Sequence, residues 1–318
     1  MIGYIAGRVV QAAGVLWAAF TLAFAVLYLL PSDPVSIQLS AAGIETDSLT
    51  PAQLAAAKAK YGLDRPIPDQ YFSALTGALH GDFGTSIAKQ APVSELLAER
   101  LGGTLTLSLI AGALAIVLGA GIAYLAAFVR IAPLRVLLDR APALGVAVPS
   151  FLVGLGLIQY FSFELGWLPS SGSGGWKYLV LPVITMALPG ASQLAQVLGR
   201  SFADTLREPY IVTARAKGLS RGAVQFRHAL RNAALPALTI IGVLVGLTVT
   251  SAIVVETVFN RNGIGRLAQE SVLAKDVPVV QAIVVVAAAG FVLINLIVDL
   301  LYPLLDPRIA HPAAAEVR

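Results

Sequence analysis

YIVTARAKGLSRGAVQFRHALRNAALP, residues 210–236, is a basic stretch in a 318-residue chain that is 57% hydrophobic and only 13% charged. A soluble domain is about 25% charged, so the composition indicates an integral membrane protein. The stretch has no acidic residue and carries five basic ones: Arg215, Lys217, Arg221, Arg227 and Arg231. Such a stretch needs an explanation of its own among the long apolar segments that surround it.

Charge and composition exclude several classes of function. The net charge of +4 comes from basic residues that cluster beside apolar segments, a distribution that reports orientation in a bilayer and not nucleic-acid binding. The chain contains no cysteine, and its three histidines, His80, His228 and His311, have no metal-ligand spacing. We therefore expect no nucleic-acid partner, disulfide, metal site or redox chemistry in this chain.

Six apolar segments are long enough to cross a bilayer core, which needs about 20 residues per helix. They are Val9–Leu30, Thr104–Val129, Ala141–Phe163, Leu179–Gly199, Ala233–Val255 and Val279–Leu301. The third and fourth are interrupted by Pro142, Pro149, Pro182 and Pro189. Neighbouring helices can satisfy the backbone groups that a proline frees. The sequence predicts an all-α membrane protein with six transmembrane helices and an external subdomain between the first two.

The orientation follows from Lys and Arg in the short connections. The connections after the second and fourth spans carry ten such residues, against four in those after the third and fifth. Because the richer side is cytoplasmic, residues 210–236 and both termini are predicted to be cytoplasmic. The first span could be a secretory signal, but its largely apolar run of 22 residues exceeds the 7 to 15 typical of one, which favours an uncleaved anchor.

The predicted organisation has four parts: a transmembrane helix (1–30), an external subdomain (31–101), a transmembrane core (102–305) that includes the cytoplasmic segment 200–232, and a cytoplasmic tail (306–318). Within the external part we expect a helix from Pro51 to Tyr61, with Thr50 as its N-cap and Gly62 after its end. A second short helix is expected to start at Pro92 and lead into the second span. This subdomain could be a rigid linker or a docking surface for an external partner.

Local signals divide residues 209–232 into two short helices. Pro209 suits the first position of a helix over Tyr210–Lys217, and Gly218 suits the left-handed residue that ends it. Ser220 can cap a second helix that runs to about Asn232. The first helix is only about 13 Å long and cannot span a membrane. Basic charge alone would fit a lipid-attracting helix, but the proline, the small residues and the glycine break together indicate a shaped knob.

This stretch resembles the cytoplasmic signature of the B-type membrane subunit in the oligopeptide/dipeptide (peptide/nickel) family of ABC importers. The pattern matches at Tyr210, Thr213, Ala214, Arg215, Ala216, Lys217, Gly218, Leu219, His228, Leu230, Arg231, Asn232 and Pro236. Val212 stands where the general importer motif has a glutamate, a departure that is common in the peptide subfamily. Family landmarks also occur in family order elsewhere: PSDP, YGLDRPIPDQY, GDFGTSI, ETVFNRNGIGRL and LLDPRI.

The resemblance implies a permease with the type I ABC importer fold in a bacterial inner membrane. It implies that a short helix docks in a cleft of a separate ATP-hydrolysing subunit, with Gly218 as a hinge and with His228, Arg231 and Asn232 as polar groups that brace it. The coupling residues would be Pro209, Tyr210, Thr213, Ala214, Arg215, Ala216, Lys217, Gly218, His228, Arg231 and Asn232. The implied partners are a second homologous permease, one or two ATP-binding subunits, an external solute-binding protein and the lipid bilayer.

This chain has no phosphate-binding loop of the type Gly-x-x-x-x-Gly-Lys-Ser/Thr, so we expect it to be a transport subunit without an ATPase site. ATP and magnesium would be bound by the partner ATPases, and this chain would carry no cofactor.

Polar residues inside the predicted spans are candidates for lining a translocation path: Gln159, Gln193, Gln196, Thr248, Ser251 and Glu256. Each could equally hold helices together, because intramembrane polar residues face bundle interiors in both cases. Glu256 could also act as a gate or meet the binding protein. Asp299 shares a helix face with Asn295, and a brace to a nearby arginine is its expected role.

Peptides are the expected solute, with glutathione-like compounds or nickel complexes as alternatives for the same permease. An ion-driven secondary transporter would instead carry inverted repeats and charged or broken sites at mid-membrane, and the sequence shows no such repeat and no charge at a clear midplane position. A membrane scaffold or receptor without a transport role also remains open.

Overall fold

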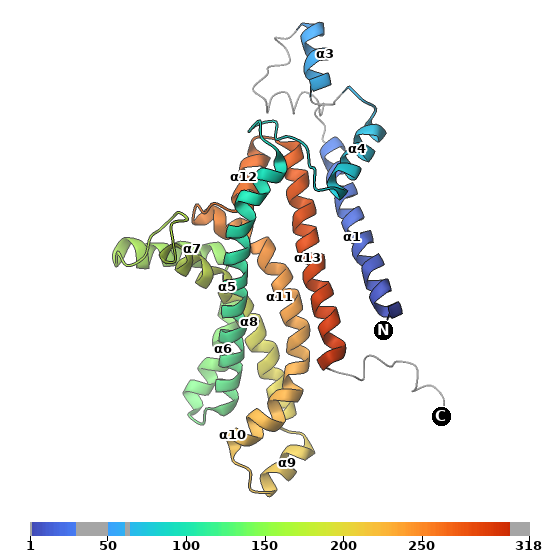
Figure 1. The fold of residues 1–318 in the computed structure, drawn as a ribbon. Coiled ribbons are helices and arrows are strands. Elements are labelled where there is room, and N and C mark those ends of the chain that lie inside the picture. The colour runs from blue at the N-terminus through green and yellow to red at the C-terminus, as the bar shows by residue number, and fades with distance from the viewer. Residues whose placement is uncertain (1, 30–49, 61–63, 306–318) are drawn as a thin grey trace. The chain divides into compact units, whose positions relative to one another are not determined.

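The computed structural model describes residues 2–29, 50–60 and 64–305, which are almost entirely helical (Figure 1). Within these ranges the β structure is an isolated bridge between Thr85 and Pro92. The predicted all-α class is therefore confirmed. The chain divides into two compact units, Met1–Gly103 with Gly263–Arg318, and Thr104–Asn262.

The first unit combines the two ends of the chain. Its helices are α1 (Ile2–Leu29), α3 (Pro51–Lys60), α4 (Ile67–Leu79), the first turns of α5 (Val93–Phe128), α12 (Ile264–Leu273) and α13 (Val277–Leu305). Helix α1 packs along α13. A second contact region is an apolar cluster that includes Val93, Leu97, Leu267, Val279 and Ala282, all of them buried. This cluster joins the start of α5 to α12 and to the first turns of α13.

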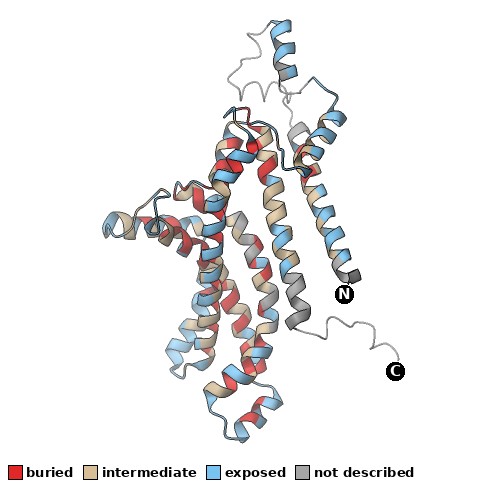
Figure 2. Cartoon of the chain, viewed as in Figure 1, coloured by how far each residue is buried: buried red, intermediate tan, exposed pale blue. Residues whose placement is uncertain are grey.

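The second unit is built around one central helix. Its elements are the rest of α5, α6 (Ala132–Ala147), α7 (Ser150–Leu157), the π-helix η2 (Ile158–Glu164), α8 (Lys177–Thr205), α9 (Pro209–Ala216), α10 (Arg221–Ala223), the π-helix η3 (Val224–Ala229) and α11 (Leu230–Val258). Helix α8 contacts α6, α7 and α11, and it carries many of the buried residues that Figure 2 shows in red. Its central place explains why two internal prolines, Pro182 and Pro189, are tolerated within it.

Four helices in the described ranges are long and apolar enough to cross a membrane, and a bent helix pair raises this to as many as five. The four spans are Ala6–Val26, Val93–Phe128, Lys177–Thr205 and Val277–Ile297. They overlap the first, second, fourth and sixth predicted spans. The fifth predicted span, Ala233–Val255, is helical throughout and lies within α11.

The third predicted span is not a single straight helix. Helix α6 and the following α7–η2 pair meet at an angle of 101°. The break falls at Val148 and Pro149, whose ψ angles of 124° and 135° are extended. Proline disfavours the α conformation in the residue before it and cannot donate the next helical hydrogen bond. The third predicted span, 141–163, is therefore broken at Pro149, although Pro142 lies within α6 without ending it.

The segment between the first two predicted spans contains one predicted helix, α3, and one that was not predicted, α4. Thr50 caps α3 as expected, because its hydroxyl accepts from the Gln53 N–H at 3.4 Å, and the Thr50 backbone N–H in turn donates to Gln53 Oε1 at 2.9 Å. The predicted end at Gly62 lies outside the described residues, as do 31–49 and the tail 306–318. Helix α4 begins directly after Pro66 and has Pro68 in its first turn, and its Tyr71 packs edge-on against Phe20 and Phe24 of α1.

The second short helix that was expected to begin at Pro92 begins instead at Val93 and continues as α5 without a break. It is therefore the start of the second span and not a separate helix.

Candidate functional site

The short helix predicted after Pro209 is present, and its end is closely defined. Helix α9 begins at Pro209 and ends at Ala216, and Gly218 follows with a φ of +80°. The N–H of Leu219 donates to the carbonyl of Ala214 (3.4 Å), and the N–H of Gly218 donates to that of Arg215 (3.0 Å). These two bonds form a Schellman motif, which needs a left-handed residue at the position of Gly218.

The two faces of α9 have different environments. Ile211 and Ala214, 0% and 6% exposed, face inward in an apolar cluster with Phe202 of α8 and Val224 of η3. Val212 is 62% exposed. The other exposed residues are Pro209, Tyr210, Thr213, Arg215, Ala216, Lys217 and Gly218. The exposed face of α9 thus combines small and apolar side chains with two cations, while Ala214 packs against its own chain.

The segment after Gly218 is continuous with the fifth span. The Ser220 side chain caps α10 by accepting from the Ala223 N–H at 3.3 Å, as expected. Helix α10 then passes through η3 directly into α11. The prediction of a separate second helix that ends near Asn232 is wrong in this respect. Consequently α9 is followed by one long helical rod. Its π-helical turn is a type of irregularity that is frequent at functional sites.

Two side chains tie this rod to the end of α5. Arg221 Nη2 donates to the Ala127 carbonyl at 3.0 Å, and Gln225 Nε2 donates to the Tyr124 carbonyl at 3.2 Å. Ala127 lies in the last turn of α5, where carbonyls lack helical donors and the helix dipole favours a cation such as Arg221. Neither contact was predicted, because a glutamine in a basic helix has no sequence signal that distinguishes it from a solvated one. Gln225 is nevertheless buried.

Of the three predicted bracing residues, Asn232 makes a hydrogen bond to α9. Its Nδ2 donates to the Tyr210 hydroxyl at 2.7 Å and so joins the first turn of α9 to α11. His228 is half-buried in η3, and Arg231 is exposed. The apolar cluster beneath α9 also contains residues of three spans: Ala123 of α5, Leu198 of α8 and Leu244 of α11. Movement of α9 can therefore be transmitted to all three helices.

We expect Tyr210→Phe to lower solute uptake about fivefold, the factor that corresponds to a hydrogen bond of about 1 kcal/mol between α9 and α11. Uptake into cells that carry each variant measures the effect. Tyr160→Phe, at an exposed tyrosine of η2, is the matched control and should leave uptake unchanged. In a double-mutant cycle with Asn232→Ala, the two losses should not add, whereas full additivity would contradict the brace.

The predicted path residues lie on several helices and have separate partners. Gln159 in η2 is exposed, and its Nε2 lies 3.5 Å from Glu164 Oε1. Gln193 in α8 is half-buried, and Gln196 Nε2 donates to the Pro142 carbonyl at 3.2 Å. This bond makes Gln196 a contact between α8 and α6. Thr248 and Ser251 in α11 are half-buried, with the Ser251 hydroxyl bonded to the Thr248 carbonyl.

Glu256 lies inside the second unit. It is 1% exposed, and its Oε1 accepts from the Thr104 hydroxyl at 2.6 Å. Five residues later, Arg261 donates to the Tyr178 carbonyl at 2.8 Å and connects the end of α11 to the start of α8. In this conformation Glu256 therefore links α11 to α5. Among the residues that the structure describes, no group of three or more histidines and carboxylates could hold a metal ion.

A buried carboxylate organises the GDFGTSI segment of the first unit. Asp276, just before α13, accepts from the Ser86 hydroxyl and from the N–H groups of Ile87 (3.2 Å) and Ala88 (3.4 Å). It is 1% exposed, so these donors replace water around its charge. The bonds fasten residues 86–88 to a position about 190 residues later in the chain.

Glu270 of α12 lies among three cations. Its carboxylate contacts Lys89 Nζ at 2.7 Å, Arg266 Nε at 2.9 Å and Arg100 Nη1 at 3.4 Å. Partial burial acts to raise the pKa of Glu270, but the Lys89 hydrogen bond and the three positive charges outweigh it and hold the pKa below its usual value. The resulting stabilisation is present above the ordinary glutamate pKa and is lost as the pH falls through the lowered one. These ion pairs thus hold the loop that carries Lys89 to α12 near neutral pH.

Comparison with known proteins identifies the family. The sequence model described as "Binding-protein-dependent transport system inner membrane component" matches residues 101–311, and the model of the corresponding N-terminal region matches residues 1–109. The glutathione transport system permease protein GsiC of Salmonella choleraesuis (strain SC-B67) is 39% identical over 98% of this chain and its own full length. The GsiC protein of Escherichia coli (strain K12) is 36% identical over the same shares.

Two solved structures share the fold. One is an amino acid ABC transporter with histidines, at a TM-score of 0.51 and 18% identity over 68% of this chain and 94% of that one. The other is the inward-facing MetNI methionine ABC transporter, at a TM-score of 0.52 and 16% identity over 66% of this chain and 96% of that one. The family match, the full-length relatives and the shared fold all agree. The chain therefore belongs to the family of binding-protein-dependent inner membrane components, and it is the permease subunit of an ABC importer.

Proposed function

We propose that this permease and a second homologous permease form the path by which short peptides of the glutathione class enter a bacterial cell. One or two separate ATP-binding subunits bind ATP and magnesium, and an external solute-binding protein delivers the peptide. The full-length relatives at 36–39% identity, which are named as glutathione transport permeases, support this solute class. Glutathione is itself a tripeptide, so it falls within the wider class of peptides.

The coupling role rests on one observation, the division of α9 into a buried face and an exposed face. The buried Ile211 and Ala214 fasten the helix to its own chain. Val212, Arg215 and Lys217 are left exposed on a helix of eight residues with a defined end. An apolar side chain with cations at its rim suits a cleft that is apolar inside and acidic at its edge. The ATPase subunit supplies that cleft in this proposal.

The test is uptake of radiolabelled glutathione in the native bacterium, with the chromosomal gene deleted and then restored on a plasmid. Deletion should abolish saturable uptake, and restoration should return it. If uptake of a labelled dipeptide is lost while glutathione uptake is unchanged, the solute is wrong and the permease role stands. If no peptide uptake changes, the proposed function is wrong.

The energy source separates this proposal from an ion-driven secondary transporter. We expect uptake to stop when cellular ATP is depleted and to continue, at least initially, when an ionophore collapses the proton gradient while ATP is maintained. The reverse pattern would identify a secondary transporter. Recovery of an ATP-binding subunit with the tagged, detergent-solubilised chain, together with uptake that depends on it, excludes a scaffold without a transport role.

The proposed orientation places both termini and α9 in the cytoplasm and residues 31–101 outside. Because the chain has no cysteine, single cysteines report the side directly. We expect an impermeant thiol reagent to label Ser171→Cys, at an exposed position before α8, in spheroplasts. Ser220→Cys, also exposed, should be labelled only after the membrane is permeabilised. Labelling of Ser220→Cys alone in sealed spheroplasts would reverse the orientation.

A further inference from the structure

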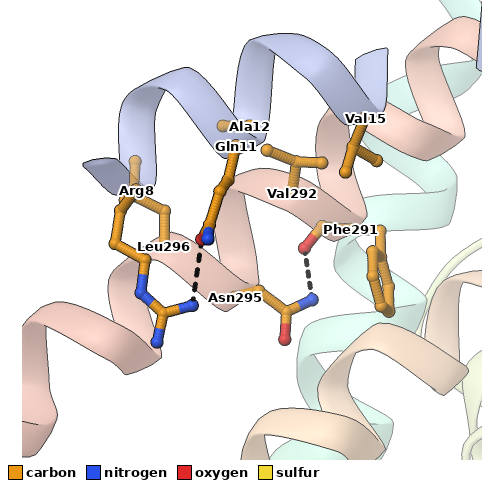
Figure 3. Close-up of a pocket in the computed structure, with 8 residues that line it drawn as sticks. All are labelled: Arg8, Gln11, Ala12, Val15, Phe291, Val292, Asn295 and Leu296. Atoms are coloured by element: carbon orange, nitrogen blue, oxygen red, sulfur yellow. Dashed lines mark hydrogen bonds between the residues drawn. The ribbon is translucent and has the colours of Figure 1, made fainter. Parts of the chain in front are cut away.

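A groove on the first unit lies between α1 and α13 and has a volume of about 160 Å³ (Figure 3). Its polar side chains have contacts on their own helices: one Arg8 nitrogen lies 3.5 Å from Gln11 Oε1, and the Asn295 amide donates to the Phe291 carbonyl at 2.9 Å. The full lining is Arg8, Gln11, Ala12, Val15, Phe291, Val292, Asn295 and Leu296. A cluster of unbalanced charge lies instead near the other end of α13, at α12.

This cluster has three cations around one carboxylate. Glu270 pairs with Lys89, Arg266 and Arg100, so two positive charges are left in excess. The side chains of Lys89 and Arg266 are 31% and 36% exposed, and both can therefore be reached by a partner. Arg100 is more buried, and its Nε has no hydrogen-bond partner in the described part of the chain. The acidic residues of the same loop and of the start of α5, all exposed and none paired with these cations among the described residues, are Asp82, Glu95 and Glu99.

Helix α12 has a buried face and an exposed face. Leu267 is buried in the apolar cluster of the first unit. Arg266, Glu270 and Leu273 follow one another at a spacing of four and then three residues, so they share the opposite face. Leu273 is 76% exposed, and the adjacent Val272 is 60% exposed. A helix of ten residues is about 15 Å long and cannot cross a bilayer, so spanning does not account for these two apolar side chains.

The ion pair between Lys89 and Glu270 shows which parts of the chain share one side of the membrane. Lys89 lies between the first two predicted spans, and Glu270 lies between the last two. Their contact at 2.7 Å requires both connections to be on the same side. In the proposed orientation that side is the outside. Separate ATPase subunits cannot reach it there, whereas an external solute-binding protein can.

The exposed face of α12 differs from that of a helix that lies on a membrane surface. Such helices carry Trp or Phe on the apolar face and many basic residues on the other. Helix α12 has no aromatic residue and a single basic one, Arg266. Its charges are also held in place, because Arg266 and Lys89 both contact the same carboxylate. Fixed cations beside a small apolar patch match a protein interface, which has an apolar centre and a polar rim.

We propose that the external solute-binding protein docks on this face of α12. Acidic residues of that protein contact Lys89 and Arg266, and an apolar side chain contacts Val272 and Leu273. The inference rests on the proposed function, because it names the place where that partner meets this permease. The description of the family as binding-protein-dependent includes such a partner. The excess positive charge steers the acidic partner to the permease, and the apolar contact slows its release.

The experiment uses the intact importer complex in nanodiscs and the external binding protein whose deletion abolishes peptide uptake in the native bacterium. That protein is purified and loaded with the same peptide, and its association and dissociation rates are measured by biolayer interferometry. Arg266→Gln should lower the association rate about fivefold and weaken its dependence on salt, whereas Arg266→Lys should keep most of the rate. Leu273→Ala should raise the dissociation rate about tenfold. The control Arg135→Gln, at an exposed arginine of α6 on the predicted cytoplasmic side, should change neither rate.

A cross-link separates the binding protein from other occupants of this face. A photoreactive group on Gln269→Cys, at an exposed position of α12, should attach to the loaded binding protein. Attachment to lipid or to the second permease instead would overturn the proposal. Unchanged rates in both Arg266→Gln and Leu273→Ala would overturn it as well, although the permease role stands as long as the binding protein supports uptake. If Arg266→Gln unfolds the first unit, Leu273→Ala decides alone, because its exposed side chain should leave the thermal unfolding midpoint unchanged.

Discussion

Gly218→Pro is expected to reduce solute uptake by at least about tenfold while the chain still inserts into the membrane. Gly218 has a φ of +80°, whereas the proline ring fixes φ near −65°. Proline also lacks the N–H that donates to the Arg215 carbonyl. The Schellman motif at the end of α9 cannot form, at a cost of about 3 kcal/mol or more. The connection between α9 and the rod α10–η3–α11 is then no longer defined.

A graded series makes this prediction specific. Gly218→Ala keeps the N–H and adds a strain of about 1–2 kcal/mol, so its uptake should lie between the wild type and Gly218→Pro. The control is Gly222→Ala, four residues later, where an added Cβ meets only Phe128, at an ordinary 3.9 Å. It should leave uptake unchanged. ATP hydrolysis stimulated by the loaded binding protein gives a second measurement. Normal stimulation and uptake in Gly218→Pro would show that the end of α9 has no part in coupling.

Asp276→Ala is expected to destabilise the first unit by about 3 kcal/mol or more. The change leaves three donors, the Ser86 hydroxyl and the N–H groups of Ile87 and Ala88, without their buried acceptor. Each unsatisfied buried donor costs about 1–3 kcal/mol. In the purified complex, we expect the segment around residues 81–92 to become sensitive to protease and the thermal unfolding midpoint to fall.

Asp82→Ala is the matched control, because Asp82 belongs to the same segment but is exposed. Its Oδ1 accepts one local hydrogen bond, from the Gly84 N–H at 2.9 Å, so its loss should cost less than about 1 kcal/mol. Asp276→Asn, which keeps one acceptor oxygen, should lie between the two. Equal protease sensitivity in Asp276→Ala and Asp82→Ala would mean that the buried carboxylate does not hold the segment.

Local features of the structure could be predicted from the sequence because their causes lie within a few residues. Pro209 and Gly218 define α9, since one fits the first turn of a helix and the other the left-handed residue beyond its end. Thr50 starts α3 for a similar reason, as the side chain that accepts from an otherwise unpaired N–H. Apolar length located most of the membrane helices, because a bilayer core demands about 20 such residues in each.

Pro149 shows that a proline in the sequence does not by itself predict where a helix breaks. Pro142, Pro182 and Pro189 lie within helices, while Pro149 coincides with a 101° bend. The four residues have the same intrinsic effect on the backbone. Whether a helix continues past a proline depends on the neighbours that can satisfy the freed carbonyl, and these neighbours come from elsewhere in the chain.

The sequence by itself determined the family, the apolar spans, the boundaries of α9 and the cations that α9 carries. Only the tertiary structure decided that Ala214 faces inward, that Gln225 and Arg221 attach to the end of α5, and that Ser86 meets Asp276. Caps, breaks and apolar length act between residues that are neighbours in the chain. Burial and these hydrogen bonds join residues that lie about 90 to 190 positions apart. Their pairing is therefore decided by the packing of helices and not by any local pattern.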